Sequence, residues 1–272
     1  MKKKISIIVA MSLLTTTACK KNTDSVAPQP NGTLPLIASI KQTMFSNQVY
    51  DLKKEFVYDS VNRLKEVKHS GANTSNVTEK YAYSGSSVQY RHYISGAETL
   101  SAAINYTLNG EGKATILVAP YFNASNVNEY NSAGYITRVN YLSNNKGTGF
   151  QLYHYRAGNI LDSISGFGAE GDKKYVHVFT YEAGKKNTIS DENRGLQMLG
   201  KVHEAPVKKR TMFSYDIISR EGERLKYFEL DYNYDYDNNG RIKKHTVVQT
   251  QYSYPSGSSQ SYIKEVMEYT YK

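Results

Sequence analysis

Residues 228–242 read FELDYNYDYDNNGRI and decide the fold class. Apolar side chains stand at every second position of this stretch, namely Phe228, Leu230, Tyr232 and Tyr234. A period of two is what a strand with one buried face requires. The run ends in the Asp-Asn-Asn-Gly sequence at 237–240, whose glycine can supply the positive φ of a tight turn. The stretch therefore predicts one antiparallel hairpin.

Six further units repeat this pattern of tyrosine followed by a turn. They lie at 56–59, 81–85, 105–110, 129–134, 153–158 and 179–184. Their tyrosines recur every 23 to 26 residues, and a gap of 55 residues, half filled by Tyr215, precedes the last unit. A period near 24 residues fits two strands and two turns. We therefore predict that residues 36–272 form one all-β domain, an antiparallel meander of about fourteen strands in repeated hairpins.

The charge pattern bears on how this sheet ends. A flat sheet of so many strands would leave edges that pair with other chains, so we expect it to curl or to close. A strand that faces lipid needs an unbroken apolar row on its outer side. Lys243 and Lys244 place a cation on each face of their strand, and Lys53, Lys54 and Glu55 place charges on both faces of another. We expect a curled sheet or a water-soluble barrel.

The first eighteen residues have the features of an export signal. Three lysines, Lys2 to Lys4, precede an apolar stretch from Ile5 to Leu14, and small residues follow up to Ala18. Cys19, the one cysteine of the 272-residue chain, comes directly after Ala18, so no internal disulfide can form. A thiol at this position can carry a diacylglycerol after cleavage, and acyl chains hold a protein at a membrane. We predict a lipoprotein signal peptide at 1–18, with lipidation at Cys19.

A linker separates this anchor from the β domain. Residues 19–35 contain Pro28, Pro30 and Pro35, half of the chain's six prolines, and show no apolar periodicity. Such a segment is typical of an extended tether. We expect a mature protein of the cell envelope, anchored by lipid in the outer membrane and facing either the periplasm or the cell surface.

Two of the repeats carry a family resemblance. The sequences YDSVNRL at 58–64 and YDNNGRI at 236–242 resemble the YD repeats of Rhs-type proteins. Together with Thr16-Thr17-Ala18-Cys19, which resembles a bacterial lipobox, the chain from 36 to 272 is similar to a family of Gram-negative envelope lipoproteins of unknown function with a porin-like β fold. The resemblance implies a fold and a location, but no activity.

One segment interrupts the repeats. From Lys185 to Pro206 the alternation stops, and Ser190-Asp191-Glu192 begins a pattern that favours one short helix near 190–200. This segment is either a plug over one end of the core or a mobile lid over a pocket.

Two motifs suggest ligands but have simpler interpretations. Gly166 to Gly171 match GxGxxG, yet strand-like residues follow it where a phosphate site needs a helix, so we expect a hairpin loop. Asp235, Asp237 and Asn239 have the spacing of a calcium loop and could hold a weak Ca²⁺. The twelfth position is Thr246 rather than glutamate, which favours an ordinary turn.

Other signatures of chemistry point away from catalysis. The six histidines lack metal-ligand spacing, no GxSxG elbow is present, and we expect neither an enzyme nor a resident metal or cofactor. Tyr90 and Tyr93 flank Arg91 and His92 and could stack on a sugar ring, whereas nucleic acid is a poor partner outside the cytoplasm.

Two functions remain open at this point. The first is a non-enzymatic scaffold or interaction component of the envelope, with a protein partner and the membrane as its contacts. The alternative is a module that binds a glycan or lipid in a pocket covered by residues 185–206.

Overall fold

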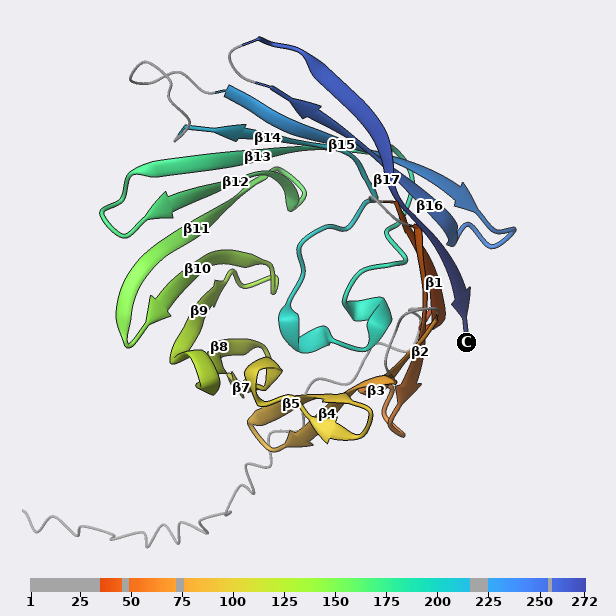
Figure 1. The fold of residues 1–272 in the computed structure, drawn as a ribbon. Helices are drawn as coiled ribbons and strands as arrows, with labels where there is room; N and C mark the ends of the chain where they lie inside the picture. Colours follow the sequence, from red (N-terminus) through yellow and green to blue (C-terminus); the bar gives the residue numbers. More distant parts are fainter. Residues whose placement is uncertain (1–34, 46–48, 72–75, 216–224, 254–255) are drawn as a thin grey trace, which may run out of the picture.

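The strands of the computed structural model close into a barrel (Figure 1). The structure describes residues 35–45, 49–71, 76–215, 225–253 and 256–272. Its strands are β1 (Ile37–Phe45), β2 (Val49–Tyr58), β3 (Leu64–Ser70), β4 (Val77–Ser84), β5 (Ser87–Ile94), β6 (Ala97–Glu98), β7 (Ile104–Leu108), β8 (Ala114–Ala119), β9 (Ala124–Tyr130), β10 (Ile136–Ser143), β11 (Lys146–Arg156), β12 (Ile160–Gly168), β13 (Lys173–Tyr181), β14 (Val207–Ser214), β15 (Leu225–Tyr236), β16 (Ile242–Tyr252) and β17 (Ser259–Tyr271).

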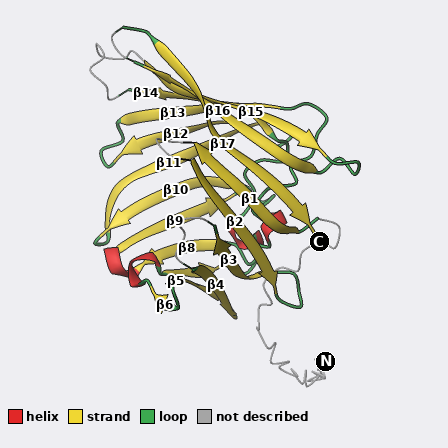
Figure 2. Ribbon diagram, turned by 45° about the vertical axis from the view of Figure 1, so that its right-hand side comes forward, coloured by secondary structure: helices red, strands yellow, loops and turns green. Residues whose placement is uncertain are grey.

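The sheet is antiparallel throughout, and each strand of the ring pairs with its neighbours in sequence. The two-residue strand β6 pairs with β5 beside the ring, so β5 continues to β7 and sixteen strands make the wall. The ring closes where β1 pairs with β17, from Ile37 opposite Tyr271 to Met44 opposite Glu265. Figure 2 shows this wall from the side. The all-β antiparallel prediction is confirmed, but the described residues hold seventeen strands rather than about fourteen.

The prediction of one continuous short helix was wrong. Instead of one short helix near 190–200, the chain forms two single-turn 3-10 helices, η3 (Glu192–Arg194) and η4 (Gln197–Leu199). Gly195 at φ 74° ends the first turn, and Gly200 at φ 78° ends the second. The left-handed conformation of Gly195 and the ψ of −177° at Gly200 cannot continue a right-handed helix, so Gly195 separates the two turns and Gly200 ends the second. Two further 3-10 turns, η1 (Leu100–Ala102) and η2 (Pro120–Phe122), were not predicted.

Four turns at one end of the barrel share the same geometry. In each, the side-chain oxygen of an aspartate or asparagine accepts hydrogen bonds from backbone N–H groups two and four residues later, as in an Asx turn. The first residues of these turns are Asp59, Asn109, Asn131 and Asp237. The residue three positions later has a positive φ in all four, from 63° to 80°. Residues 182–206 lie inside the barrel at this end (Figure 1), so we call it the plugged end. The opposite end is the far end.

Tyrosines near the plugged end satisfy backbone carbonyls of the neighbouring strand. Each of these tyrosines lies near the end of a strand that runs toward the plugged end. Its hydroxyl donates to a backbone carbonyl at the start of the preceding strand. The pairs are Tyr58 to Ile37, Tyr130 to Ala114, Tyr181 to Leu161, Tyr234 to Val207 and Tyr271 to Ile242, at 2.5 to 2.8 Å. A buried carbonyl without a partner would cost free energy, so the recurring tyrosine has a structural reason.

The outer face of the wall is polar. Lys209 of β14 lies 3.3 Å from Asp231 and 3.8 Å from Glu229 on β15, with all three on the outward rows of their strands. The core lies inside at the plugged end, where Ile37, Leu64, Leu108, Ala114 and Ile242 are buried together.

Candidate functional site

The segment between β13 and β14, residues 182–206, lies inside the barrel rather than across its rim (Figure 1). We call it the plug. Its Leu196 and Met198 join the hydrophobic core of the wall, with 8% and 4% of their surfaces exposed. The plug is therefore part of the packed interior at this end.

Backbone amides of the wall hold the plug in place. Three strands that begin directly after an Asx turn have a register shift at that point, and their first amide donates into the plug instead of across the ladder. The bonds run from Leu64 N–H to the carbonyl of Gly195 (3.1 Å), from Ile136 N–H to the carbonyl of Lys201 (3.2 Å) and from Ile242 N–H to Thr188 Oγ1 (2.9 Å). The same local irregularity thus recurs as an attachment point around the ring.

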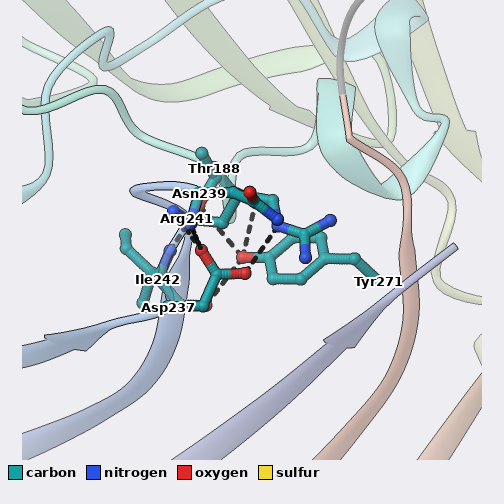
Figure 3. A network of polar contacts seen from close by, with 6 residues as sticks. All are labelled: Thr188, Asp237, Asn239, Arg241, Ile242 and Tyr271. Atoms are coloured by element: carbon teal, nitrogen blue, oxygen red, sulfur yellow. Dashed lines mark hydrogen bonds and ion pairs between the residues drawn. The ribbon is translucent and has the colours of Figure 1, made fainter.

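Figure 3 shows one attachment point in detail. Ile242 donates its amide to Thr188 and accepts at its carbonyl from the Tyr271 hydroxyl, 2.7 Å away. The preceding turn is fixed by Asp237, whose Oδ2 accepts from Arg241 Nε at 2.7 Å, and the Arg241 guanidinium lies over the Tyr271 ring at 4.7 Å. The network joins a turn, two strands and the plug, so both backbone groups of Ile242 are satisfied.

The plug does not fill the interior. A cavity of about 760 Å³ lies between the plug and the inner wall. On the wall side it is lined by Phe179 of β13, Arg210 of β14, Tyr232 and Tyr234 of β15 and His245 of β16. Aromatic rings and a few polar groups on rigid strands make up this surface, which is the composition of a small-molecule site.

Arg210 of β14 is the cation among these wall residues. Its guanidinium lies 3.0 Å from His177 Nε2 and 5.7 Å from the Phe228 ring, and it hydrogen-bonds the Tyr232 side chain. Among the residues that the structure describes, no carboxylate forms an ion pair with it. A partly buried guanidinium thus faces the cavity without a counter-ion.

The surrounding imidazoles do not add to this charge. Burial, and secondarily the positive charge of Arg210, lower the pKa of both His177 and His203 to about 4. Burial, and secondarily Arg194, lower the pKa of His245 to about 4 as well. All three rings are therefore neutral near pH 7.

His245 also has an unsatisfied atom. Its Nδ1 lies 3.1 Å from the Tyr269 hydroxyl, while its buried Nε2 has no hydrogen-bond partner. Either ring tautomer leaves Nε2 without a partner, as a donor in one and as an acceptor in the other. An unpartnered buried polar atom costs free energy unless something else satisfies it.

The tyrosines predicted to stack on a sugar do not lie together. Tyr90 faces the interior, where its ring lies 5.2 Å from that of Tyr81 and packs against the core. Tyr93, three positions later, is on the outer face with Lys80 Nζ 4.9 Å from its ring. An odd separation along a strand places two side chains on opposite faces, so no shared stacking surface forms.

The residues with calcium-loop spacing belong to a turn instead. Both carboxylate oxygens of Asp237 accept hydrogen bonds within the turn at 237–241, where Asn239 contributes its backbone amide, and Asp235 is an exposed residue of β15. Across the described residues, no group of three or more His, Cys, Asp or Glu side chains is arranged to hold a metal ion. The GxGxxG match covers the end of β12 and the turn to β13, as a hairpin.

The predicted signal peptide, Cys19 and the tether up to residue 34 lie outside the described residues. In the part of the chain that is described, no helix has the length and apolar character of a membrane span.

Sequence reasoning missed the lining of the cavity. Arg210 ends the run Lys208-Lys209-Arg210, and only the register of β14 tells which of these cations points inward. His177 lies in KKYVHVFTY, where both faces carry apolar residues, so alternation assigns it to neither side.

Comparisons with known proteins agree on the fold. No protein-family model matches the sequence, and no curated protein matches it. A porin-like protein from Bacteroides uniformis ATCC 8492 has a similar structure, with a TM-score of 0.61 and 17% identity over 87% of this chain and 96% of that one. A porin-like protein from Bacteroides vulgatus ATCC 8482 matches with a TM-score of 0.52 and 11% identity over 88% and 99%. At these identities the likeness shows a shared porin-like β fold.

Proposed function

We propose that this chain is a non-enzymatic binding protein of the cell envelope that holds a small ligand in the cavity between the plug and the wall. The cavity carries the proposal, because its 760 Å³ falls within the roughly 300–1,000 Å³ of sites for small ligands. A pure scaffold has no need for such a space, since filling it with apolar side chains would add stability.

The attachment of the plug distinguishes a fixed wall from a lid. Opening the plug would break the bonds from Leu64, Ile136 and Ile242 and expose Leu196 and Met198 to water. Each broken bond costs on the order of 1 kcal/mol, and burial of the two apolar side chains contributes roughly 1.5–3 kcal/mol each. We therefore propose that the plug is a permanent wall of the site.

The envelope location is also part of the proposal. It rests on the export signal and Cys19, on the polar outer face of the barrel, and on the likeness to porin-like proteins. A Cys19→Ala variant should move from the membrane fraction to the soluble fraction. Unchanged membrane association and mobility of this variant would contradict the anchor.

Titration calorimetry against a panel of envelope glycans, lipids and small metabolites tests the binding function. A Val207→Phe variant narrows the cavity, which Val207 lines, and should abolish any saturable binding. Val178→Phe on β13 is the matched control, because Val178 lies on the outward row between Thr211 and Ser163. Binding that survives Val207→Phe would contradict the site, and a flat response across the whole panel would favour a scaffold.

A further inference from the structure

We infer that the ligand of this cavity carries a single carboxylate group, which the guanidinium of Arg210 binds. This inference rests on the proposed binding function and names the chemical class that the site selects.

Arg210 differs from the interior cations Lys54 and Lys113, which have carboxylates near them. The charge of Lys54 lies near the carboxylates of Glu79 and Glu265, and Lys113 donates to the Gln197 carbonyl at 2.8 Å with Glu192 nearby. Arg210 has neutral rings around it instead of a carboxylate. Charges removed from water are normally paired, so an inward cation without a counter-ion indicates that the counter-ion arrives with the ligand.

The acids of the plug do not fill this role. The carboxylate of Glu204 accepts from the Tyr135 hydroxyl, and Asp191 Oδ1 lies 3.6 Å from Arg194 Nη1. Both acids line the same cavity as Arg210, yet each is engaged with another partner, and Glu192, the third acid of the lining, lies near Lys113. The cavity thus offers Arg210 to an incoming anion rather than to a residue of the chain.

The charges of the lining limit how much negative charge the site can neutralise. The imidazoles of His177, His203 and His245 are uncharged at neutral pH, so they can hydrogen-bond a ligand without balancing charge. The lining holds four cations, Lys113, Lys186, Lys201 and Arg210, and three acids, Asp191, Glu192 and Glu204, so its formal excess is one positive charge. That excess matches one negative charge, and the planar fork of Arg210 fits the two oxygens of a carboxylate. A phosphate with nearly two charges would leave part of its charge unbalanced. The unpartnered Nε2 of His245 is a further polar contact on the same wall.

Matched pairs of probes that differ at the charged group test the inference. D-galacturonate is compared with D-galactose, and benzoate with benzamide, by calorimetry and by the shift in melting temperature. At least one acid should bind saturably while its neutral partner binds tenfold more weakly or worse.

Variants then assign the selectivity to the residue. Arg210→Gln should remove the preference for the acid, with at least a tenfold loss of affinity, which corresponds to about 1.4 kcal/mol. Arg210→Lys, which keeps the charge but not the fork, should lose less. Arg138→Gln is the control, since Arg138 lies on the outer face over the Phe150 ring. A cooperative melting transition of Arg210→Gln without ligand establishes that the variant folds.

The outcomes separate the two proposals. Equal binding of acid and neutral partner, or full retention of acid binding in Arg210→Gln, would overturn the carboxylate inference. If neutral probes bind and Val207→Phe abolishes that binding, the proposed function stands without it. Absence of binding by both acids would also overturn the inference, whereas the wider panel decides the binding function itself.

Discussion

The two ends of this barrel differ in how their backbone groups are hydrogen-bonded and in how much apolar surface they expose. At the plugged end, Asx turns, tyrosine hydroxyls and the plug satisfy the backbone, and Leu64 is 1% exposed. At the far end, apolar side chains face solvent, and Phe122 of η2 is 59% exposed. Eight of the nine large hydrophobic residues that are exposed in the described structure belong to far-end segments, namely Val49, Ile94, Leu100, Tyr121, Phe122, Tyr227, Tyr262 and Ile263.

The difference shows where the stability of the fold resides. A closed sheet satisfies its ladders all round, but each hairpin end still leaves backbone groups to be paired. The plugged end pairs many of them by repeating one turn and one tyrosine contact around the ring. The far end leaves apolar surface in water, which adds little to folding. We therefore expect substitutions at the two ends to differ sharply in cost.

The largest effect should come from acid. The pKa values of His177, His203 and His245 are about 4 in the folded protein, below the 6.5 of an exposed histidine. Between these values the unfolded chain binds more protons, so stability is full above pH 6.5 and falls as the pH drops to 4. Each histidine should account for roughly 2–3 kcal/mol at pH 4.

Urea unfolding measured from pH 7.5 to pH 4 checks this expectation. His177→Gln and His245→Gln should each flatten the curve, whereas His154→Gln on the outward row of β11 should not. A pH dependence that is unchanged in the His177 and His245 variants would contradict the assignment.

The next effect concerns the glycine at the junction of plug and wall. A Cβ on Gly195, which has φ 74°, would lie 2.7 Å from Leu64 N and 3.0 Å from the Asn62 carbonyl oxygen. Gly195→Ala should cost about 3 kcal/mol of unfolding free energy. Gly96 at the far end has φ 85° and open space around it, so Gly96→Ala should cost about 1 kcal/mol. If urea unfolding gives the two variants equal losses of unfolding free energy, the plug can shift to accommodate a Cβ at Gly195.

A smaller difference should separate two threonines. Thr188→Val removes the acceptor of the buried Ile242 amide and should cost about 2 kcal/mol. The matched change Thr43→Val removes an exposed bond to Asp51 at the far end of β1 and should cost less than about 0.5 kcal/mol. Thermal unfolding of both variants measures the difference in stability. A larger loss of stability in Thr43→Val than in Thr188→Val would contradict the prediction.

The turn acid should matter less still. Asp59→Ala removes the acceptor of two backbone amides and should cost about 1 kcal/mol. Asp59→Asn keeps that acceptor, as Asn109 and Asn131 do in equivalent turns, and should cost under half as much. If the two variants are equally unstable in urea, the ion pair with Arg63 rather than the Asx turn holds the hairpin.

The smallest effect is expected at the far end. Phe122→Ser should change the free energy of unfolding by less than about 0.5 kcal/mol, because the ring is mostly in water. A loss above 1 kcal/mol would mean that this rim contributes to folding after all.

The sequence predicted the parts of the fold that are local. Alternation in residues 228–234 and the turn at 237–240 are read from neighbouring residues, and β15 and β16 form there as expected. The interior position of residues 185–206 depends on partners far along the chain, such as Leu64 for Gly195, and no local pattern encodes such a pairing. The expected helix is interrupted at Gly195 and Gly200 because neither residue has right-handed helical dihedral angles, and the carbonyl of Gly195 accepts instead from Leu64 of the wall.

The candidate site was harder to predict than the fold. Arg210 differs from Lys209 only in the side of β14 on which it falls, and the register that decides this is set by β13 and β15. The tyrosine pair at 90 and 93 failed for the opposite reason, since alternation alone already assigns the two rings to different faces. Where chemistry depends on which face of a strand is inside, a cluster in sequence is a poor guide.

The seam between β1 and β17 has a consequence for biosynthesis. Ser39 contacts Thr270 across 231 positions of sequence. The barrel can therefore close only after β17, the last strand to be synthesised, is available to pair with β1. A nascent chain that emerges from its N-terminus carries two open edges until translation is nearly finished, and such edges pair readily with other chains. Joining the neighbouring ends and opening the circle between two other strands would change which edges stay exposed, and for how long.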